Sequence, residues 1–241
     1  MDIKEKMNLG FEGLYEHGPI TIVAFGDSVT HGAVGQGEMD YENVYWNRLK
    51  RKIYAKRAYM PVNVINAGIG GDTASRAVAR MEKQVLAHNP DLVIVSFGLN
   101  DVNGELQDFL NGLREIFSRL QERDIPVIFM TPNMLNTYVA EGTPAMYLEY
   151  AKSTATIQTT GRMDEYMQKA VELALGMGVK VCDCYAQWKE LAKTQDTTLL
   201  LANRINHPIS AMHELFAKAL YQVIFEEETQ FKENDTTMYQ G

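Results

Sequence analysis

Residues 20–28 read ITIVAFGDS, an apolar run that stops at Gly26, Asp27 and Ser28. The run is nearly continuous rather than alternating, which is typical of a parallel strand that helices cover on both faces. It therefore predicts a buried strand over residues 20–25. Four further runs, rich in β-branched residues, predict strands of the same kind over residues 62–66, 92–97, 126–130 and 179–182.

Segments with a helical period separate these strands. Apolar residues recur three and four positions apart over residues 78–85, 106–120 and 163–174, and each pattern predicts a helix with one buried stripe. Pro208, followed by apolar residues up to Val223, predicts a last helix that carries the proline in its first turn. The alternation of strands and helices predicts an α/β fold with a parallel sheet.

The composition is that of a globular chain. Its 241 residues are 46% hydrophobic, which suffices for one domain with a sizeable core. We expect a single domain over residues 1–241, with its core between about residues 20 and 225 and a polar tail over residues 226–241. The 23 Lys and Arg against 31 Asp and Glu give a formal net charge of -8, which would repel a phosphate backbone, so nucleic acid is not an expected partner.

The cysteines and the apolar segments indicate a compartment. Cys182 and Cys184 are the only cysteines, and no second pair of metal ligands accompanies them, so neither a disulfide framework nor a metal site is predicted. A reducing compartment fits this usage. No signal-peptide run opens the sequence, and no stretch reaches the roughly 18 apolar residues that a membrane span needs. We therefore expect a cytoplasmic protein without a membrane partner.

The segment over residues 132–160 is too long for a plain connection. It follows the predicted strand 126–130 at its carboxyl end, where open α/β sheets bind ligands, so one interpretation is an excursion that faces the substrate. The other interpretation is a surface loop with a short helix around residues 145–152. The sequence leaves both open.

Four segments with small or polar residues lie at the carboxyl ends of predicted strands or before the last helix. They are GDSVT at 26–30, NAGIGGDT at 66–73, GLND at 98–101 and HP at 207–208. The carboxyl ends of parallel strands share one edge of the sheet. We therefore expect Ser28, Gly71, Asn100 and His207 to meet at that edge.

These residue types are the ones that acyl transfer needs. A serine hydroxyl becomes a strong nucleophile when an imidazole takes its proton, which gives roles to Ser28 and His207. The amides of Ser28 and Gly71 and the side chain of Asn100 would donate to the oxyanion, each contributing about 3–4 kcal/mol in the transition state. A helix beginning at Pro208 would direct its positive end at His207 and keep the imidazole neutral. A lone serine in such a turn is more often a helix cap, and the three other segments change that reading.

In these four blocks and their order, the chain resembles the SGNH hydrolases, also called GDSL esterases and lipases. The resemblance covers residues from about 20 to 221. It implies a three-layer α/β/α sandwich with a five-stranded parallel sheet in flavodoxin-like order, and ester or thioester hydrolysis through an acyl-serine. It also implies Gly71 as an oxyanion donor, no metal and no cofactor.

One position departs from that family. The family usually has an aspartate three residues before the histidine, and this chain has Arg204 there. Three explanations compete: a dyad of Ser28 and His207 whose imidazole is held by a main-chain carbonyl, a carboxylate supplied from elsewhere, or a loss of activity. Asp183, at the end of a predicted strand, is a candidate for the carboxylate, although such an aspartate more often caps the next segment.

Two basic side chains are candidates for substrate binding. Arg204 would suit a carboxylate or phosphate group on a substrate, and the alternative is an arginine that is solvated or paired locally. His31 lies near Ser28 in the sequence and is a candidate to line the pocket.

The sequence thus predicts a serine esterase that removes a small acyl group, plausibly acetyl, from a hydroxylated or carbohydrate substrate. The alternatives are an acyl-thioesterase or lysophospholipase and, from a different class, a non-catalytic binding protein on a hydrolase scaffold. A small-molecule ester is the expected partner, and the sequence makes no prediction of oligomeric state.

Overall fold

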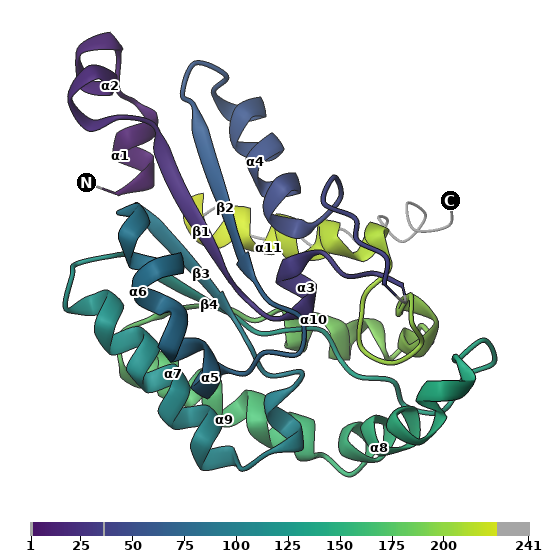
Figure 1. The fold of residues 1–241 in the computed structure, drawn as a ribbon. Helices are drawn as coiled ribbons and strands as arrows, with labels where there is room; N and C mark the ends of the chain where they lie inside the picture. Colours follow the sequence, from purple (N-terminus) through teal and green to yellow (C-terminus); the bar gives the residue numbers. More distant parts are fainter. Residues whose placement is uncertain (1, 36, 226–241) are drawn as a thin grey trace.

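Five parallel strands form one sheet in the order β2-β1-β3-β4-β5 (Figure 1). The structure is a computed structural model and describes residues 2–35 and 37–225. The strands are β1 (Ile20–Gly26), β2 (Val62–Gly68), β3 (Leu92–Ser96), β4 (Val127–Met130) and β5 (Lys180–Cys182). This is the flavodoxin-like order, so the predicted fold class is confirmed, and each strand begins and ends within two residues of its predicted position.

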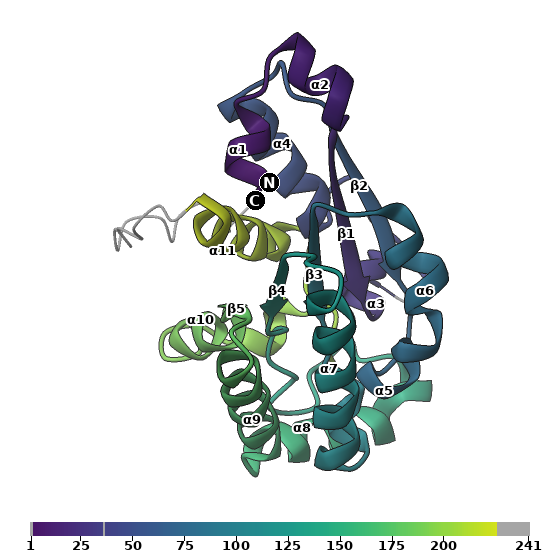
Figure 2. The ribbon, with the colours of Figure 1, turned by 90° about the vertical axis from the view of Figure 1, so that its left-hand side faces the viewer.

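Helices cover both faces of the sheet and make the three layers (Figure 2). Four lie on one face: α1 (Ile3–Met7), α4 (Tyr45–Lys56), α10 (Cys184–Leu191) and α11 (His213–Phe225). The other face carries α5 (Ala74–Ala77), α6 (Met81–Gln84), α7 (Leu106–Gln121) and α9 (Arg162–Gly176). Because both faces are covered, the strands bury their side chains on both sides, as their continuous apolar sequences require.

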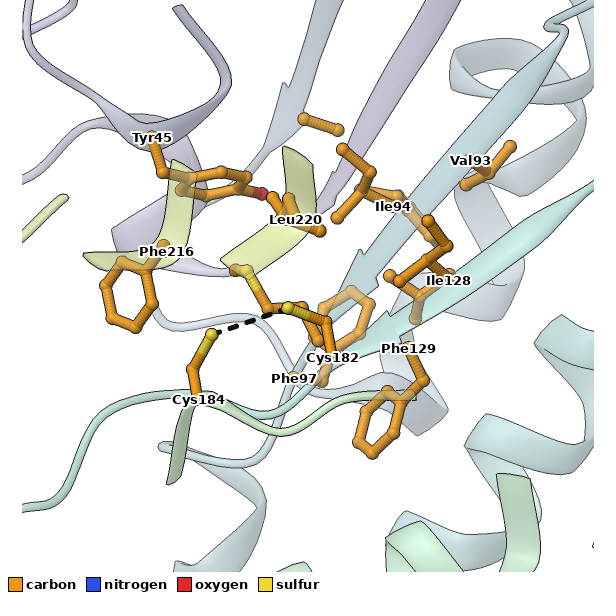
Figure 3. Packing of buried hydrophobic residues seen from close by; sticks show 14 of the residues in the cluster. Tyr45, Val93, Ile94, Phe97, Ile128, Phe129, Cys182, Cys184, Phe216 and Leu220 are labelled. Carbon is orange, nitrogen blue, oxygen red and sulfur yellow. Dashed lines mark hydrogen bonds between the residues drawn. The ribbon is translucent and has the colours of Figure 1, made fainter. Parts of the chain in front are cut away.

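The core lies between the sheet and these helices. Figure 3 shows the part of it in which Tyr45 of α4 and Phe216 of α11 belong to one cluster with Ile94 of β3, all fully buried. Phe25 and Phe97 pack edge to face with their ring centroids 5.3 Å apart, an arrangement that favours aromatic pairs.

The two cysteines lie in this core. Cys182 ends β5, and Cys184 is the first residue of α10 rather than a strand residue as the sequence suggested. Their Sγ atoms are 3.6 Å apart as free thiols (Figure 3). Burial raises the pKa of the Cys184 thiol well above its usual value, so the pair packs as two small apolar side chains.

Two predicted helices have other boundaries. The segment 78–85 is broken into the 3₁₀ turn Val78–Arg80 and α6 instead of one helix. The last helix starts at His213 after a 3₁₀ turn, Ser210–Met212, and Pro208 lies outside it. Pro208 instead forms an antiparallel bridge with Leu201, so this proline closes a loop rather than opening a helix.

The excursion over residues 132–160 contains a 3₁₀ turn, Ala145–Tyr147, followed by α8 (Leu148–Thr159), a longer helix than expected. Two more helices had no sequence prediction, α2 (Phe11–His17) and α3 (Ser28–His31). Further 3₁₀ turns are Leu86–His88, Asp101–Asn103 and Thr197–Leu200. The predicted polar tail at 226–241 lies outside the described residues. Among the helices that the structure describes, none has the length and apolar character needed to cross a membrane.

Candidate active site

Ser28 stands at a tight turn between β1 and α3. It is the first residue of α3, and Asp27 caps the helix by accepting a hydrogen bond from the Val29 amide at 3.0 Å. A Cβ at Gly26 would lie 2.6 Å from the Ser96 carbonyl oxygen, so only glycine lets β1 turn this closely. The turn leaves the Ser28 amide in the first turn of a helix, where it has no intrahelical acceptor.

His207 meets Ser28 across the sheet edge. The distance from His207 Nε2 to Ser28 Oγ is 3.0 Å, although 179 residues separate the two in the chain. Ser28 is 7% exposed. Burial lowers the pKa of His207 to about 4, and the Val34 main chain beside the ring opposes this shift. The imidazole is therefore neutral at neutral pH and can accept the Ser28 proton.

The cause of this neutrality differs from the predicted one. The expected helix dipole at Pro208 does not exist, since the helix starts at His213, and desolvation keeps the ring neutral instead. Within the described part of the chain, no group makes a hydrogen bond of normal geometry with the buried Nδ1 of His207. The Val34 main chain is the nearest identified influence on the ring, as in the interpretation of a dyad held by a main-chain carbonyl.

The glycine-rich segment after β2 lies against α3. A Cβ at Gly68 would collide with the His31 amide nitrogen, and a Cβ at Gly70 would come within 3.9 Å of Ser28 Cβ. Gly71 has φ +75°, a left-handed conformation that favours glycine. Its amide donates to no other group among the described residues, so it remains free to bind an oxygen atom near Ser28.

Asn100 joins the segment after β3 to the one after β2. Its Nδ2 donates to the Asp72 carbonyl at 2.9 Å, which leaves the second N–H of the amide available. Asp101 accepts a hydrogen bond from the Ala74 amide at 2.8 Å. The structure therefore brings Ser28, Gly71, Asn100 and His207 to one edge of the sheet.

Arg80 is a residue of this region that the sequence analysis did not identify. It donates to Asp72 at 2.7 Å and to the Gly26 carbonyl at 3.0 Å. It also lies over the Phe25 ring, 4.5 Å from the centroid. Arg80 thus ties the carboxyl ends of β1 and β2 together, and no local sequence signal marks an arginine for that task.

Two buried carboxyl groups lie close to the reacting pair. Burial raises the pKa of Asp27 to about 7, and repulsion from Asp101 and Asp72 adds to the rise. Burial also raises the pKa of Asp101 to about 7. Arg80 pairs with Asp72 alone of these three, so the two other carboxyl groups keep their protons more readily than ordinary aspartates do.

The proposed role of Asp183 is wrong. Its Oδ1 accepts hydrogen bonds from Thr131 Oγ1 at 2.8 Å and from the Ala186 amide at 3.0 Å. It therefore caps α10, the alternative that the sequence left open, and makes no hydrogen bond to His207. The requirement for an N-cap at the start of α10 determines where this carboxylate points.

Arg204 also has a local task. Its guanidinium donates to the Leu199 and Leu201 carbonyl oxygens at 2.5 and 3.2 Å, so it pairs with its own loop rather than presenting a clamp for a substrate anion. His31 ends α3, and its ring centroid lies 6.3 Å from that of Tyr41. Its contact with substrate stays a prediction. Among the described residues, no group of three or more His, Cys, Asp or Glu side chains could hold a metal ion.

Comparisons with known proteins give the same picture of the chain. The model of the GDSL-like lipase/acylhydrolase family matches residues 24–215. The acetylxylan esterase of Geobacillus stearothermophilus is 26% identical over 193 residues, which are 80% of this chain and 83% of that protein. Its crystal structure superposes with a TM-score of 0.67 at 24% identity, covering 88% of this chain and 97% of the esterase.

Other solved structures agree in fold. An acetyl xylan esterase named AlAXEase superposes with a TM-score of 0.66 at 22% identity, covering 84% of this chain and 98% of that one. Solved structures of the Geobacillus esterase include catalytic mutants in which a serine, a histidine or an aspartate three residues before that histidine becomes alanine. The family model spans all four sequence blocks of this sheet edge. The chain is therefore a hydrolase of ester bonds and belongs to the GDSL-like lipase/acylhydrolase family.

Proposed function

We propose that the protein is a serine esterase that removes acetyl groups from a hydroxylated or carbohydrate substrate through an acyl-serine intermediate. The single observation that carries the proposal is the 3.0 Å contact between Ser28 Oγ and a neutral His207 Nε2. Free hydrogen-bond donors of the Ser28 and Gly71 amides lie beside it. The similarity to acetylxylan esterases supports the choice of acyl group and of substrate class.

In the acylation step, His207 Nε2 takes the Ser28 proton while Oγ attacks the carbonyl carbon of the ester. The carbonyl oxygen becomes an oxyanion, to which the Ser28 amide, the Gly71 amide and Asn100 Nδ2 donate hydrogen bonds. When this tetrahedral intermediate collapses, the C–O bond to the alcohol breaks. The imidazolium gives its proton to the departing alkoxide, so that the sugar leaves as a neutral alcohol and the acyl group stays on Ser28.

In the deacylation step, water replaces the alcohol. His207 takes a proton from the water, and the hydroxide attacks the acyl-serine carbonyl. The second tetrahedral intermediate breaks its bond to Oγ, and the proton held by His207 returns to Ser28. The products are acetate and the free enzyme. No carboxylate takes part, and the Val34 main chain is the group that stabilises the imidazolium.

The length of the acyl chain tests this proposal. With p-nitrophenyl esters of increasing chain length, we expect kcat/KM to be highest for acetate and to fall by about 10-fold or more by octanoate. The reason is that a small acyl pocket rejects longer chains because they would overpack it. The same series with Ser28→Ala gives the background rate. A maximum at long chains would instead identify a lysophospholipase or thioesterase.

Covalent labelling tests the remaining alternative. A fluorophosphonate is expected to label Ser28 in a 1:1 ratio. No labelling and no hydrolysis of any ester, together with unchanged ligand binding in Ser28→Ala, would identify a binding protein that has kept a hydrolase scaffold.

Removing the Asn100 side chain tests the oxyanion site. Asn100→Ala is expected to lower kcat by about 10²–10³-fold with little change in KM, because the lost donor acts mainly in the transition state. Steady-state kinetics with p-nitrophenyl acetate measures this. Asn111→Ala, which removes an exposed asparagine of α7, is the matched control. A loss of less than about threefold in Asn100→Ala would exclude Asn100 from the oxyanion site.

We further propose a small-molecule ester in the cytoplasm as the working partner. Two thiols that stay free at a separation of 3.6 Å support a reducing compartment. The net charge of -8 argues against a nucleic-acid partner.

A further inference from the structure

The loop that carries His207 is closed on itself. Leu201 and Pro208 form an antiparallel bridge, and the Ala202 amide donates to the His207 carbonyl at 2.7 Å. Arg204, at the turn of this loop, has φ +59°, a left-handed conformation that is costly for a residue with a Cβ. The backbone between residues 202 and 207 must therefore be held by specific contacts.

A single side-chain atom supplies most of those contacts. Asn203 Oδ1 accepts hydrogen bonds from the amides of Ile205, Asn206 and His207, each at 3.0 Å. Asn203 Nδ2 donates to Asn206 Oδ1 at 2.8 Å. Three successive backbone N–H groups thus converge on one oxygen atom, and the last of them belongs to His207.

The outside of the loop is fixed to the segment that follows β4. Buried Asn133 donates through Nδ2 to the Asn206 carbonyl at 2.9 Å. The Asn136 amide donates to the Ile205 carbonyl at 2.9 Å. These contacts anchor the loop to the rest of the protein, and Asn203 shapes its interior.

The ring of His207 lacks the support that the family's aspartate gives. Arg204 occupies that position in the sequence, and Asp183 caps α10. Across the described residues, Nδ1 of His207 has no hydrogen-bond partner of normal geometry. Since no side chain orients the ring directly, the position of Nε2 depends on where the backbone places His207.

We infer that Asn203 is a positioning residue for the reaction. Its Oδ1 holds the backbone amides of residues 205–207 so that His207 Nε2 stays at hydrogen-bond distance from Ser28 Oγ. The contact acts on the main chain, whereas the aspartate of the family would act on the imidazole ring. The inference rests on the proposed role of His207 as the base.

Kinetics of two substitutions test the inference. Asn203→Ala removes the acceptor, and we expect kcat for p-nitrophenyl acetate to fall by about 10–100-fold with KM within about threefold, since a displacement of about 1 Å at a reacting group can cost about 10²-fold. The rate of Ser28 labelling by a fluorophosphonate is expected to fall by the same factor. Asn203→Asp keeps an oxygen that can accept all three amides, so its kcat is expected to stay within about threefold of the unsubstituted protein.

Asp196→Ala is the matched control. It removes another turn acceptor, one that binds the Thr198 amide at 3.0 Å in a neighbouring turn, and we expect it to leave kcat unchanged. Wild-type kcat and labelling rate in Asn203→Ala would overturn the inference. An equal loss in Asn203→Asp and Asn203→Ala would also overturn it, because the acceptor oxygen would then not be the relevant group.

Circular dichroism shows whether each variant is folded. If Asn203→Ala does not fold, Asn203→Ser replaces it, and Asn203→Asp decides: wild-type kcat in Asn203→Asp supports the inference, and a loss of 10-fold or more overturns it. Failure of the proposed function looks different, because then Ser28→Ala would retain activity and no Asn203 variant would change the labelling of Ser28.

Discussion

Ser28→Ala is expected to lower kcat for acetyl ester hydrolysis by at least about 10²-fold and by up to about 10⁶-fold. Loss of the nucleophile from a complete triad costs about 10⁶, but loss of the carboxylate alone costs about 10⁴. The larger loss applies if the Val34 main chain and the loop around Asn203 hold the imidazole as well as a carboxylate would. The smaller loss applies if they do not, so the measured value reports how well His207 is held.

The measurement is steady-state hydrolysis of p-nitrophenyl acetate, corrected for the rate without protein. Ser75→Ala is the matched control, because Ser75 is an exposed serine after β2 on the same edge of the sheet. We expect that control to keep the original kcat and to react with a fluorophosphonate, whereas Ser28→Ala does neither. A Ser28→Ala protein that loses less than about 10-fold would exclude Ser28 as the nucleophile.

His207→Ala is expected to cause a loss of the same size as Ser28→Ala. The two side chains act as one unit through their 3.0 Å contact, so removing both should cost no more than removing one. Steady-state kinetics of the two single variants and the double variant measures this. His88→Ala, which removes an exposed histidine, serves as the control and is expected to be fully active. Additive losses in the double variant would show that the two groups do not cooperate.

The pH dependence follows from the pKa of His207. Because burial lowers that pKa from 6.5 to about 4, kcat/KM is expected to be constant from pH 8 down to about 5 and to fall below about pH 4, where the ring takes up a proton. A base with an ordinary histidine pKa would lose activity near pH 6.5. A midpoint near 6.5 in the kcat/KM profile would show that the ring is not desolvated in the working enzyme.

Stability must be followed over the same range. As pH falls from 6.5 to about 4, the unfolded state takes up a proton at His207 that the folded state does not, so this residue lowers the free energy of unfolding. Asp27 and Asp101 have the opposite effect, since their folded-state pKa values of about 7 exceed the ordinary 3.8. They raise the free energy of unfolding as pH falls from about 7 to about 4. Circular dichroism at each pH separates unfolding from titration of the base.

The strands and the site blocks could be predicted from the sequence for a local reason. A strand buried on both faces needs a continuous apolar run, and five such runs mark β1 to β5 within two residues. The carboxyl ends of parallel strands fall on one edge, so the positions of Ser28, Gly71 and Asn100 followed from the pattern. Sequence neighbours determine these features, because burial and backbone conformation depend on residues only a few positions away.

The partners of the polar side chains depended on the tertiary structure. Asp183 caps α10 and Arg204 binds its own loop, although either might have served the reaction on sequence position alone. Burial, rather than a helix end at Pro208, keeps His207 neutral. A hydrogen bond depends on separations of about 3 Å and on direction, and segments far apart in the chain set those values only when they pack. The sequence therefore determined the fold and the edge where the site lies, and the packing of the loops determined which groups hold the imidazole.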